Sequence, residues 1–193
     1  MTFAIPSLRD VVYGLFGAWR LAHLDPAGMT YFERTVDGFW KSFFAAVLIA
    51  PAYILVIALD AIRNPPEADM ARVVLVHTLA YVLNWVVFPV LAHGICTAID
   101  RASAFIDLIV ALNWTKVIQT AAYIPIVLIT TSDLLPGALA ALINAVVYSL
   151  LLAYQWFVTR TALGVGAAAA VGLVALDLFI GLMIDGFAIG MVR

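Results

Sequence analysis

Apolar stretches of about 20 residues, separated by short polar segments, follow one another along most of the chain. A helix needs roughly 20 mainly apolar residues to cross about 30 Å of hydrocarbon. The polar residues near 97–112, among them Asp100 and Asp107, predict a short helix on the membrane surface. The pattern therefore predicts an all-α polytopic membrane protein, a bundle of five transmembrane helices at about 41–60, 73–95, 114–131, 134–157 and 162–183.

The first 24 residues have a different pattern, in which apolar side chains recur with a helical period between residues 7 and 24. Arg9 and Arg20 lie away from that apolar face. Such a helix lies in the plane of the lipid headgroups with its apolar face down; the alternative is a helix packed on a partner protein. We therefore divide the chain into a cytoplasmic-face amphipathic segment, 1–38, and a transmembrane domain, 39–193. The residues predicted to contact lipid are Leu8, Val12, Leu15, Phe16 and Trp19.

Composition agrees with a lipid environment. Hydrophobic residues make up 65% of the chain and charged residues 11%, whereas soluble domains have about 45–50% apolar and about 25% charged residues. A water-soluble fold of this size could not hide that excess. The net charge is −2 and there is no basic cluster, which argues against nucleic acid as a partner and leaves the lipid bilayer as the first one.

The distribution of basic residues predicts the orientation. One side of the predicted bundle holds seven, namely Arg9, Arg20, Arg34, Lys41, Arg101, Lys116 and Arg160. The other side holds three, namely Arg63, Arg72 and Arg193. Because the basic side of a membrane protein faces the cytoplasm, we expect a bacterial inner-membrane protein with a cytoplasmic N-terminus and a periplasmic C-terminus.

Two aspartates in the last span are the most informative polar residues. Asp177 and Asp185 are eight residues apart and share one helical stripe with Gly181. A carboxyl group at depth costs about 2.5–3.5 kcal/mol and needs a partner, a proton or a water-filled cavity. The pair predicts a proton- or cation-binding site, with His77 as the expected partner of Asp177 at similar depth. The alternatives are a neutral Asp177 hydrogen-bonded between helices and a solvated Asp185 at the interface.

Three amides lie inside other spans: Asn84, Gln119 and Asn144. They could line a path for a polar solute. The alternative is that they form interhelical hydrogen bonds, each worth about 0.6 kcal/mol.

Small residues recur at a spacing of four in the last span. Gly164, Ala168 and Gly172 form this stripe, and Gly181 continues the small-residue content of the same helix. Small residues at this spacing let helix backbones approach closely. We expect the partner helix to belong to the same chain; a second copy is the alternative.

Sequence motifs for reaction chemistry are missing. The chain has no HExxH, GxSxG or Walker A motif, and Cys96 is its single cysteine. The histidines are scattered and form no spacing typical of metal ligands. We therefore expect no enzymatic activity, no cofactor and no metal.

Segments 113–125 (NWTKVIQTAAYIP) and 154–163 (YQWFVTRTAL), in a layout of five closely spaced helices, resemble the bacterial form of the Yip1-domain membrane proteins. The resemblance implies a five-helix bundle with a cytoplasmic N-terminus, and it brings no catalytic residues. Eukaryotic members of that family are tied to membrane trafficking and small-GTPase partners. Because the predicted cytoplasmic segment is a short amphipathic helix, we do not expect such a role for this chain.

Two functions follow from these observations. The first is a non-enzymatic scaffold or accessory subunit, which forms a homo-oligomer or joins a larger membrane complex. The second is a small transporter or channel that uses Asp177 with His77 and the intramembrane amides.

Overall fold

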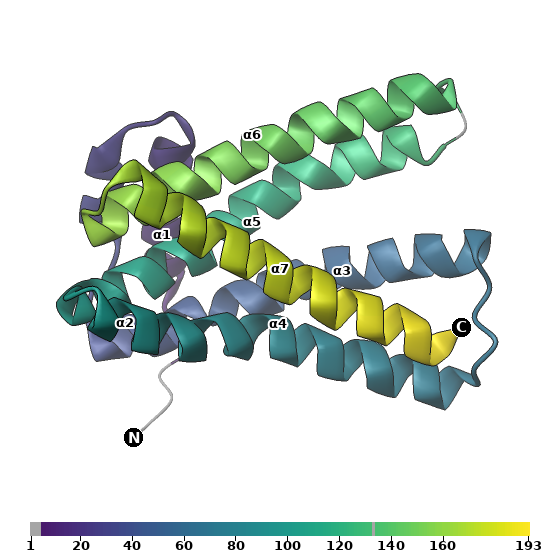
Figure 1. Ribbon diagram of the computed structural model, residues 1–193, viewed down its shortest axis with the longest axis horizontal. Helices are drawn as coiled ribbons and strands as arrows, with labels where there is room; N and C mark the ends of the chain where they lie inside the picture. The colour runs from purple at the N-terminus through teal and green to yellow at the C-terminus, as the bar shows by residue number, and fades with distance from the viewer. Residues whose placement is uncertain (1–4, 133) are drawn as a thin grey trace.

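The structure, a computed structural model, describes residues 5–132 and 134–193, and within these ranges all regular structure is helical (Figure 1). The prediction of an all-α fold is therefore confirmed. The elements are, in order, α1 (Leu8–Ala22), the 3-10 segment η1 (Pro26–Tyr31), α2 (Val36–Ser42), α3 (Phe44–Arg63), α4 (Met70–Ala98), η2 (Ala102–Ala104), α5 (Phe105–Thr130), α6 (Gly137–Leu163) and α7 (Ala167–Val192).

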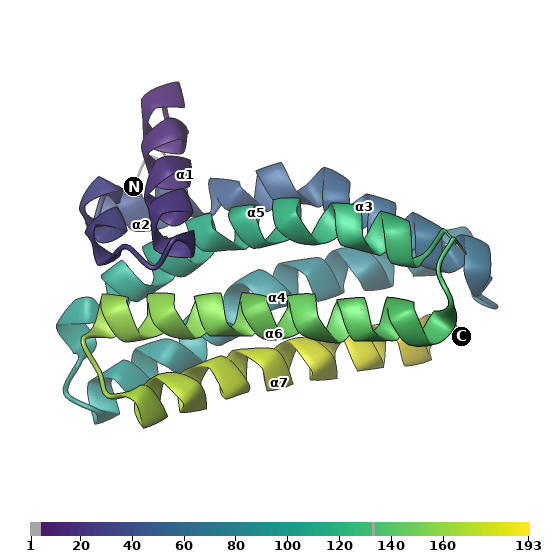
Figure 2. The same cartoon turned by 90° about the horizontal axis from the view of Figure 1, so that it is seen from above.

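The long helices α3 to α7 run along a common axis, and α1, η1 and α2 gather at one end of them (Figure 1). Figure 2 shows α1 lying across that axis. Helices α5 and α6 form an antiparallel hairpin, α4 and α7 pack along each other, and α5 also contacts α1, α2 and α3. Because of these contacts, α5 has more protein neighbours than any other long helix.

The helix ends follow from local sequence. The Ser7 hydroxyl accepts a hydrogen bond from the Asp10 amide, and the Asp10 carboxylate accepts one from the Ser7 amide, which forms a capping box at the start of α1. Asp69 caps α4 by accepting from the Arg72 amide at 2.9 Å. Gly164 ends α6 with a φ of +60°, which glycine adopts without the steric cost of a Cβ atom.

Four helical stretches of the described chain are long and apolar enough to cross a membrane: Val36–Arg63, α4, α6 and α7. Their apolar side chains point outward to a large extent, since only 11% of the most apolar window is buried in Val36–Arg63 and in α6. Water-soluble proteins rarely expose continuous apolar faces of this length. The lipid environment predicted from composition has structural support in these four helices.

The segment before Trp114 differs from the prediction. We expected a separate surface helix near 97–112, but α5 begins at Phe105 and continues without a break to Thr130. Its residues 108–115 are all buried, under α1 and α2 among others. The prediction of a surface helix was wrong because Asp107 lies at the start of α5, where Arg34 pairs with it at 3.1 Å, and does not mark a polar helix.

Helix α1 has two different faces. One face packs on α5 and α6; the Tyr154 hydroxyl donates to the Ala18 carbonyl at 2.6 Å. Gly14 lies so close to the ring of Trp114 that a Cβ atom would come within 2.5 Å of it. Of the residues predicted to contact lipid, Leu15 is half-buried, whereas Leu8, Val12, Phe16 and Trp19 are exposed. One face of α1 thus rests on protein while the other stays uncovered.

An ion-pair cluster joins the N-terminal elements. Lys41 at the end of α2 lies 3.6 Å from a carboxylate oxygen of Asp10, 3.1 Å from Glu33 and 2.6 Å from Asp37. A network of several carboxylates around one partly buried ammonium stabilises a fold more than an isolated surface ion pair does. The cluster therefore joins α1 and the segment around Glu33 to α2 at their end of the bundle.

Candidate functional site

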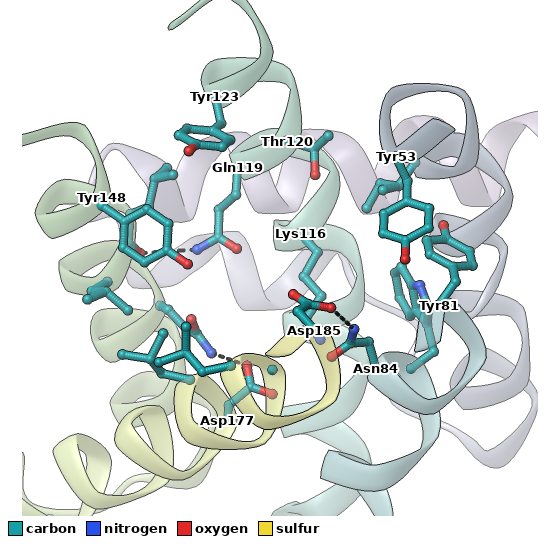
Figure 3. Close-up of a pocket in the computed structure, with 18 residues that line it drawn as sticks. Tyr53, Tyr81, Asn84, Lys116, Gln119, Thr120, Tyr123, Tyr148, Asp177 and Asp185 are labelled. Carbon is teal, nitrogen blue, oxygen red and sulfur yellow. Dashed lines mark hydrogen bonds between the residues drawn. The ribbon is translucent and has the colours of Figure 1, made fainter. Parts of the chain in front are cut away.

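A cavity of about 390 Å³ lies among the five long helices, each of which contributes side chains to it (Figure 3). We call it the mid-bundle cavity, because Lys116 lies near the middle of α5 and Asn84 near the middle of α4. Its charged lining residues are Lys116, Asp177 and Asp185. Its volume is within the range of about 300–1,000 Å³ that is typical of small-molecule sites.

Each carboxylate of the cavity accepts a hydrogen bond from an amide on another helix. Gln155 Nε2 on α6 donates to Asp177 Oδ2 at 2.6 Å, and Asn84 Nδ2 on α4 donates to Asp185 Oδ1 at 3.0 Å. A carboxylate has about four lone-pair positions. Both aspartates therefore keep acceptor capacity for a solute in the cavity.

Lys116 provides a positive charge in the same space. Its Nζ atom lies 5.3 Å from the centroid of the Trp85 ring, which is within the distance of a cation–π interaction. Among the residues that the structure describes, Lys116 forms no ion pair. The side chain extends from α5 toward the part of the cavity where Asn84 and Asp185 meet (Figure 3).

Aromatic side chains supply much of the remaining wall. Tyr53 and Tyr81 lie with their ring centroids 4.6 Å apart, and Tyr123 and Tyr148 form an edge-to-face pair at 6.1 Å. The Tyr81 hydroxyl donates to the Ala46 carbonyl at 2.5 Å, which joins α4 to α3. The two pairs place aromatic rings from α3, α4, α5 and α6 in the wall of the cavity.

Four of the six residues predicted for a polar site meet here: Asp177, Asp185, Asn84 and Gln119 all line the mid-bundle cavity. Gln119 Nε2 also donates to the Leu151 carbonyl at 3.1 Å, so Gln119 both forms a hydrogen bond between α5 and α6 and lines the cavity.

The other two predicted residues lie elsewhere. His77 lines a small recess near Asp60 and Arg193. Among the described residues no hydrogen bond or ion pair joins it to Asp177, which accepts from Gln155 instead. Asn144 Nδ2 donates to the Ala140 carbonyl of its own helix at 2.9 Å and does not line the cavity. Similar depth along two helices was the only argument for a contact between His77 and Asp177, and depth does not fix which faces meet.

The small-residue stripe is also placed differently from our expectation. Gly164, Ala168 and Gly172 are exposed, and a Cβ atom added at Gly164 or Gly172 would have no neighbour within 4 Å. The prediction of packing within the chain was wrong for these three. Gly181 faces the cavity, and a Cβ atom added to it would lie 3.8 Å from Asn84 Oδ1.

Lys116 and Gln155 are the principal lining residues that sequence reasoning missed. Lys116 was assigned to the interface because the third span was expected to begin at 114; a start at Phe105 moves it by more than two turns toward the middle of the helix. Gln155 is an amide in an apolar stretch, which is the same signal that marks Gln119 and Asn144.

The side chains of the cavity are suited to binding a small polar solute. Its carboxylates, ammonium, amides and rings can ion-pair, hydrogen-bond and make cation–π contacts with a small solute. Within the described residues, no group of three or more His, Cys, Asp and Glu side chains could hold a metal ion. No family model, curated protein or solved structure matches the chain, so the resemblance to Yip1-domain proteins stays a prediction.

Proposed function

We propose that this chain is a small membrane transporter or channel that binds a polar solute in the mid-bundle cavity. The observation that carries the proposal is the presence of Lys116, Asp177 and Asp185 around one cavity, midway along helices with apolar outer faces. Each such charge costs about 2.5–3.5 kcal/mol at the centre of a bilayer and marks solute or ion pathways when it faces a cavity.

The proposed membrane arrangement has five spans, with α5 as the fifth beside the four apolar ones. Helix α5 has 26 residues, which is enough to cross the hydrocarbon. It is not among the four candidate spans, and it turns Lys116, Gln119 and Thr120 toward the cavity. A central helix of this kind needs little lipid-facing surface.

The proposed orientation places the end that holds α1 and α2 in the cytoplasm of a bacterial inner membrane and the C-terminus in the periplasm. Lys116 lies inside α5, so of the seven basic residues counted on that side six remain, against three on the other side. The excess still supports a cytoplasmic N-terminus. The uncovered apolar face of α1, which lies across the bundle axis, supports contact with the headgroup region.

Cysteine accessibility tests the proposal without knowledge of the solute. In a Cys96→Ala background, Thr120→Cys places a thiol in the cavity, and Val82→Cys places one on the outer face of α4, where Val82 is 51% exposed and does not line the cavity. We expect a charged, membrane-impermeant thiol reagent to modify Thr120→Cys in vesicles, because ions reach the cavity through water. Val82→Cys should stay unmodified, because its thiol faces lipid.

Labelling of Thr120→Cys from one or both sides of the membrane gives the access route, and a flux assay with Asp177→Asn then tests transport. If Thr120→Cys is as unreactive as Val82→Cys in folded protein, the cavity is closed to polar solutes and the proposal fails.

A second function, that of an accessory subunit or homo-oligomer, is favoured by a different observation. The exposed stripe of Gly164, Ala168 and Gly172 has no covering helix within the described chain, and small residues at this spacing suit a close helix–helix contact. Gly172→Leu should then lower the mass of the particle in mild detergent to that of a monomer. A wild-type monomer under the same conditions would contradict this second function.

A further inference from the structure

We propose that the solute of the mid-bundle cavity is a small monovalent organic cation, an amine or a quaternary ammonium, and that the ammonium of Lys116 occupies its position over Trp85 in the empty protein. This inference rests on the proposed function and specifies its substrate class. It depends on three features: the charge of the lining, the aromatic walls and the position of Lys116.

The charge of the lining favours a cation. With all groups ionised, the two carboxylates of Asp177 and Asp185 and the ammonium of Lys116 leave a net charge of −1. One monovalent cation balances this charge, whereas a monovalent anion would make the net charge −2. Like charges that share one cavity repel each other, so the lining selects against anions.

The aromatic walls favour an organic cation over a metal ion. Trp85, the pair of Tyr53 and Tyr81, and the pair of Tyr123 and Tyr148 surround the same space. Aromatic rings attract ammonium groups and form the cages that recognise quaternary ammonium ligands. Metal ions such as Mg²⁺ and Ca²⁺ prefer a shell of several oxygen ligands, whereas the described lining supplies two carboxylates, each of which already accepts a hydrogen bond from an amide.

Lys116 already makes the interaction that such a ligand would make. Its ammonium lies 5.3 Å from the centroid of the Trp85 ring, so this ring face is open to an ammonium group. The lysine side chain is a flexible four-carbon stem, which can move aside when another cation enters. Lys116 is then a competitor that the ligand displaces, and not a ligand-binding group.

Calorimetry on the full chain in detergent, with choline as the probe, tests the inference. We expect choline to bind, and its neutral isostere 3,3-dimethyl-1-butanol to bind at least about tenfold more weakly. Trp85→Leu should weaken choline binding by about 2- to 30-fold, the range that a cation–π contact supplies. Trp156→Leu is the matched control, because that ring holds Arg160 at 5.5 Å outside the cavity and its removal should leave choline binding unchanged.

The decisive variant is Lys116→Met, which keeps an unbranched side chain of nearly the same length and removes its charge. We expect it to bind choline more tightly than the wild type, because the competing ammonium is gone.

If Trp85→Leu does not fold, Trp85→Phe replaces it, and we expect a smaller loss of choline affinity.

Three outcomes overturn the inference: failure of both choline and methylammonium to bind, equal binding of the neutral isostere, or loss of choline binding in Lys116→Met. Acetate binding that Lys116→Met abolishes would assign an anionic solute instead. In each of these cases, labelling of Thr120→Cys keeps the transport proposal standing, so failure of the substrate class and failure of the function are separable.

Discussion

The hydrogen bond between Asn113 and Ser42 predicts an unusual result when both residues are replaced. Asn113 Nδ2 on α5 donates to Ser42 Oγ at the end of α2 at 2.9 Å, and Ser42 Oγ donates to the Phe39 carbonyl at 2.7 Å. Ser42 is 0% and Asn113 3% exposed. The pair is therefore a buried polar link between the N-terminal elements and the helix at the centre of the bundle.

The two single replacements should differ in cost. Ser42→Ala leaves the Asn113 amide group buried without this partner, which costs about 1–3 kcal/mol. Asn113→Leu leaves the Ser42 hydroxyl with its donor bond to Phe39 intact, so only the net worth of one hydrogen bond, about 0.5–1.5 kcal/mol, is lost. The double variant has no unsatisfied amide, so we expect its stability to be close to that of Asn113→Leu alone.

Unfolding in mixed micelles with increasing sodium dodecyl sulfate measures these free energies for all four proteins in a double-mutant cycle. The expected coupling is about 1 kcal/mol or more, since residues in one hydrogen-bond network are not additive. If the losses of the two single variants simply add in the double variant, Asn113 and Ser42 do not form the buried link.

Three further predictions concern the N-terminal elements. Tyr154→Phe removes the 2.6 Å hydrogen bond to α1 and should speed hydrogen exchange in α1 by about 2- to 10-fold, the equivalent of about 0.5–1.5 kcal/mol; unchanged exchange would contradict the contact. The pKa of Asp25 is lowered because its carboxylate accepts hydrogen bonds from the Ala27 amide and the Arg20 guanidinium. Its contribution to stability is therefore present above the unfolded pKa and is lost as the pH falls below about 4. Asp25→Asn should lower the melting temperature at pH 7 and make it depend less on acid pH, and equal pH profiles of the two proteins would refute this. Lys41→Met leaves three carboxylates without their shared cation and should lower the melting temperature, with partial recovery in 0.5 M salt because salt screens like charges; a melting temperature that salt does not change would count against the cluster.

Sequence patterns predicted the helical content well, and they failed where lipid and protein interior look alike. The apolar run in residues 108–115 reads the same whether lipid or other helices surround it, and only the structure shows that it is the most buried stretch of α5. The prediction took Asp107 as a sign of a surface helix. An ion pair with Arg34 over a sequence separation of 73 residues explains that position, and no local pattern reveals a partner so distant.

The candidate site was predictable in its residue types but not in its pairings. Asp177 and Asp185 drew attention because carboxylates in a span are costly, and they do line the cavity. Their amide partners, Gln155 and Asn84, depend on which helices are neighbours and on how each is rotated. Lys116 was misplaced through an error in a helix boundary, because moving the start of a helix changes the depth of every residue in it.

The position of α5 has a consequence for biogenesis. In the proposed membrane arrangement, a helix that carries Lys116 and Gln119 near its middle enters the bilayer poorly by itself. Only the short segment between Thr130 and Gly137 joins it to α6, which is one of the four candidate spans. We therefore expect the ribosome to have synthesised α6 before α5 leaves the translocon, with both helices inserting as one hairpin. Lengthening the connection would then trap chains with α5 outside the membrane, which is a failure of insertion and not of stability.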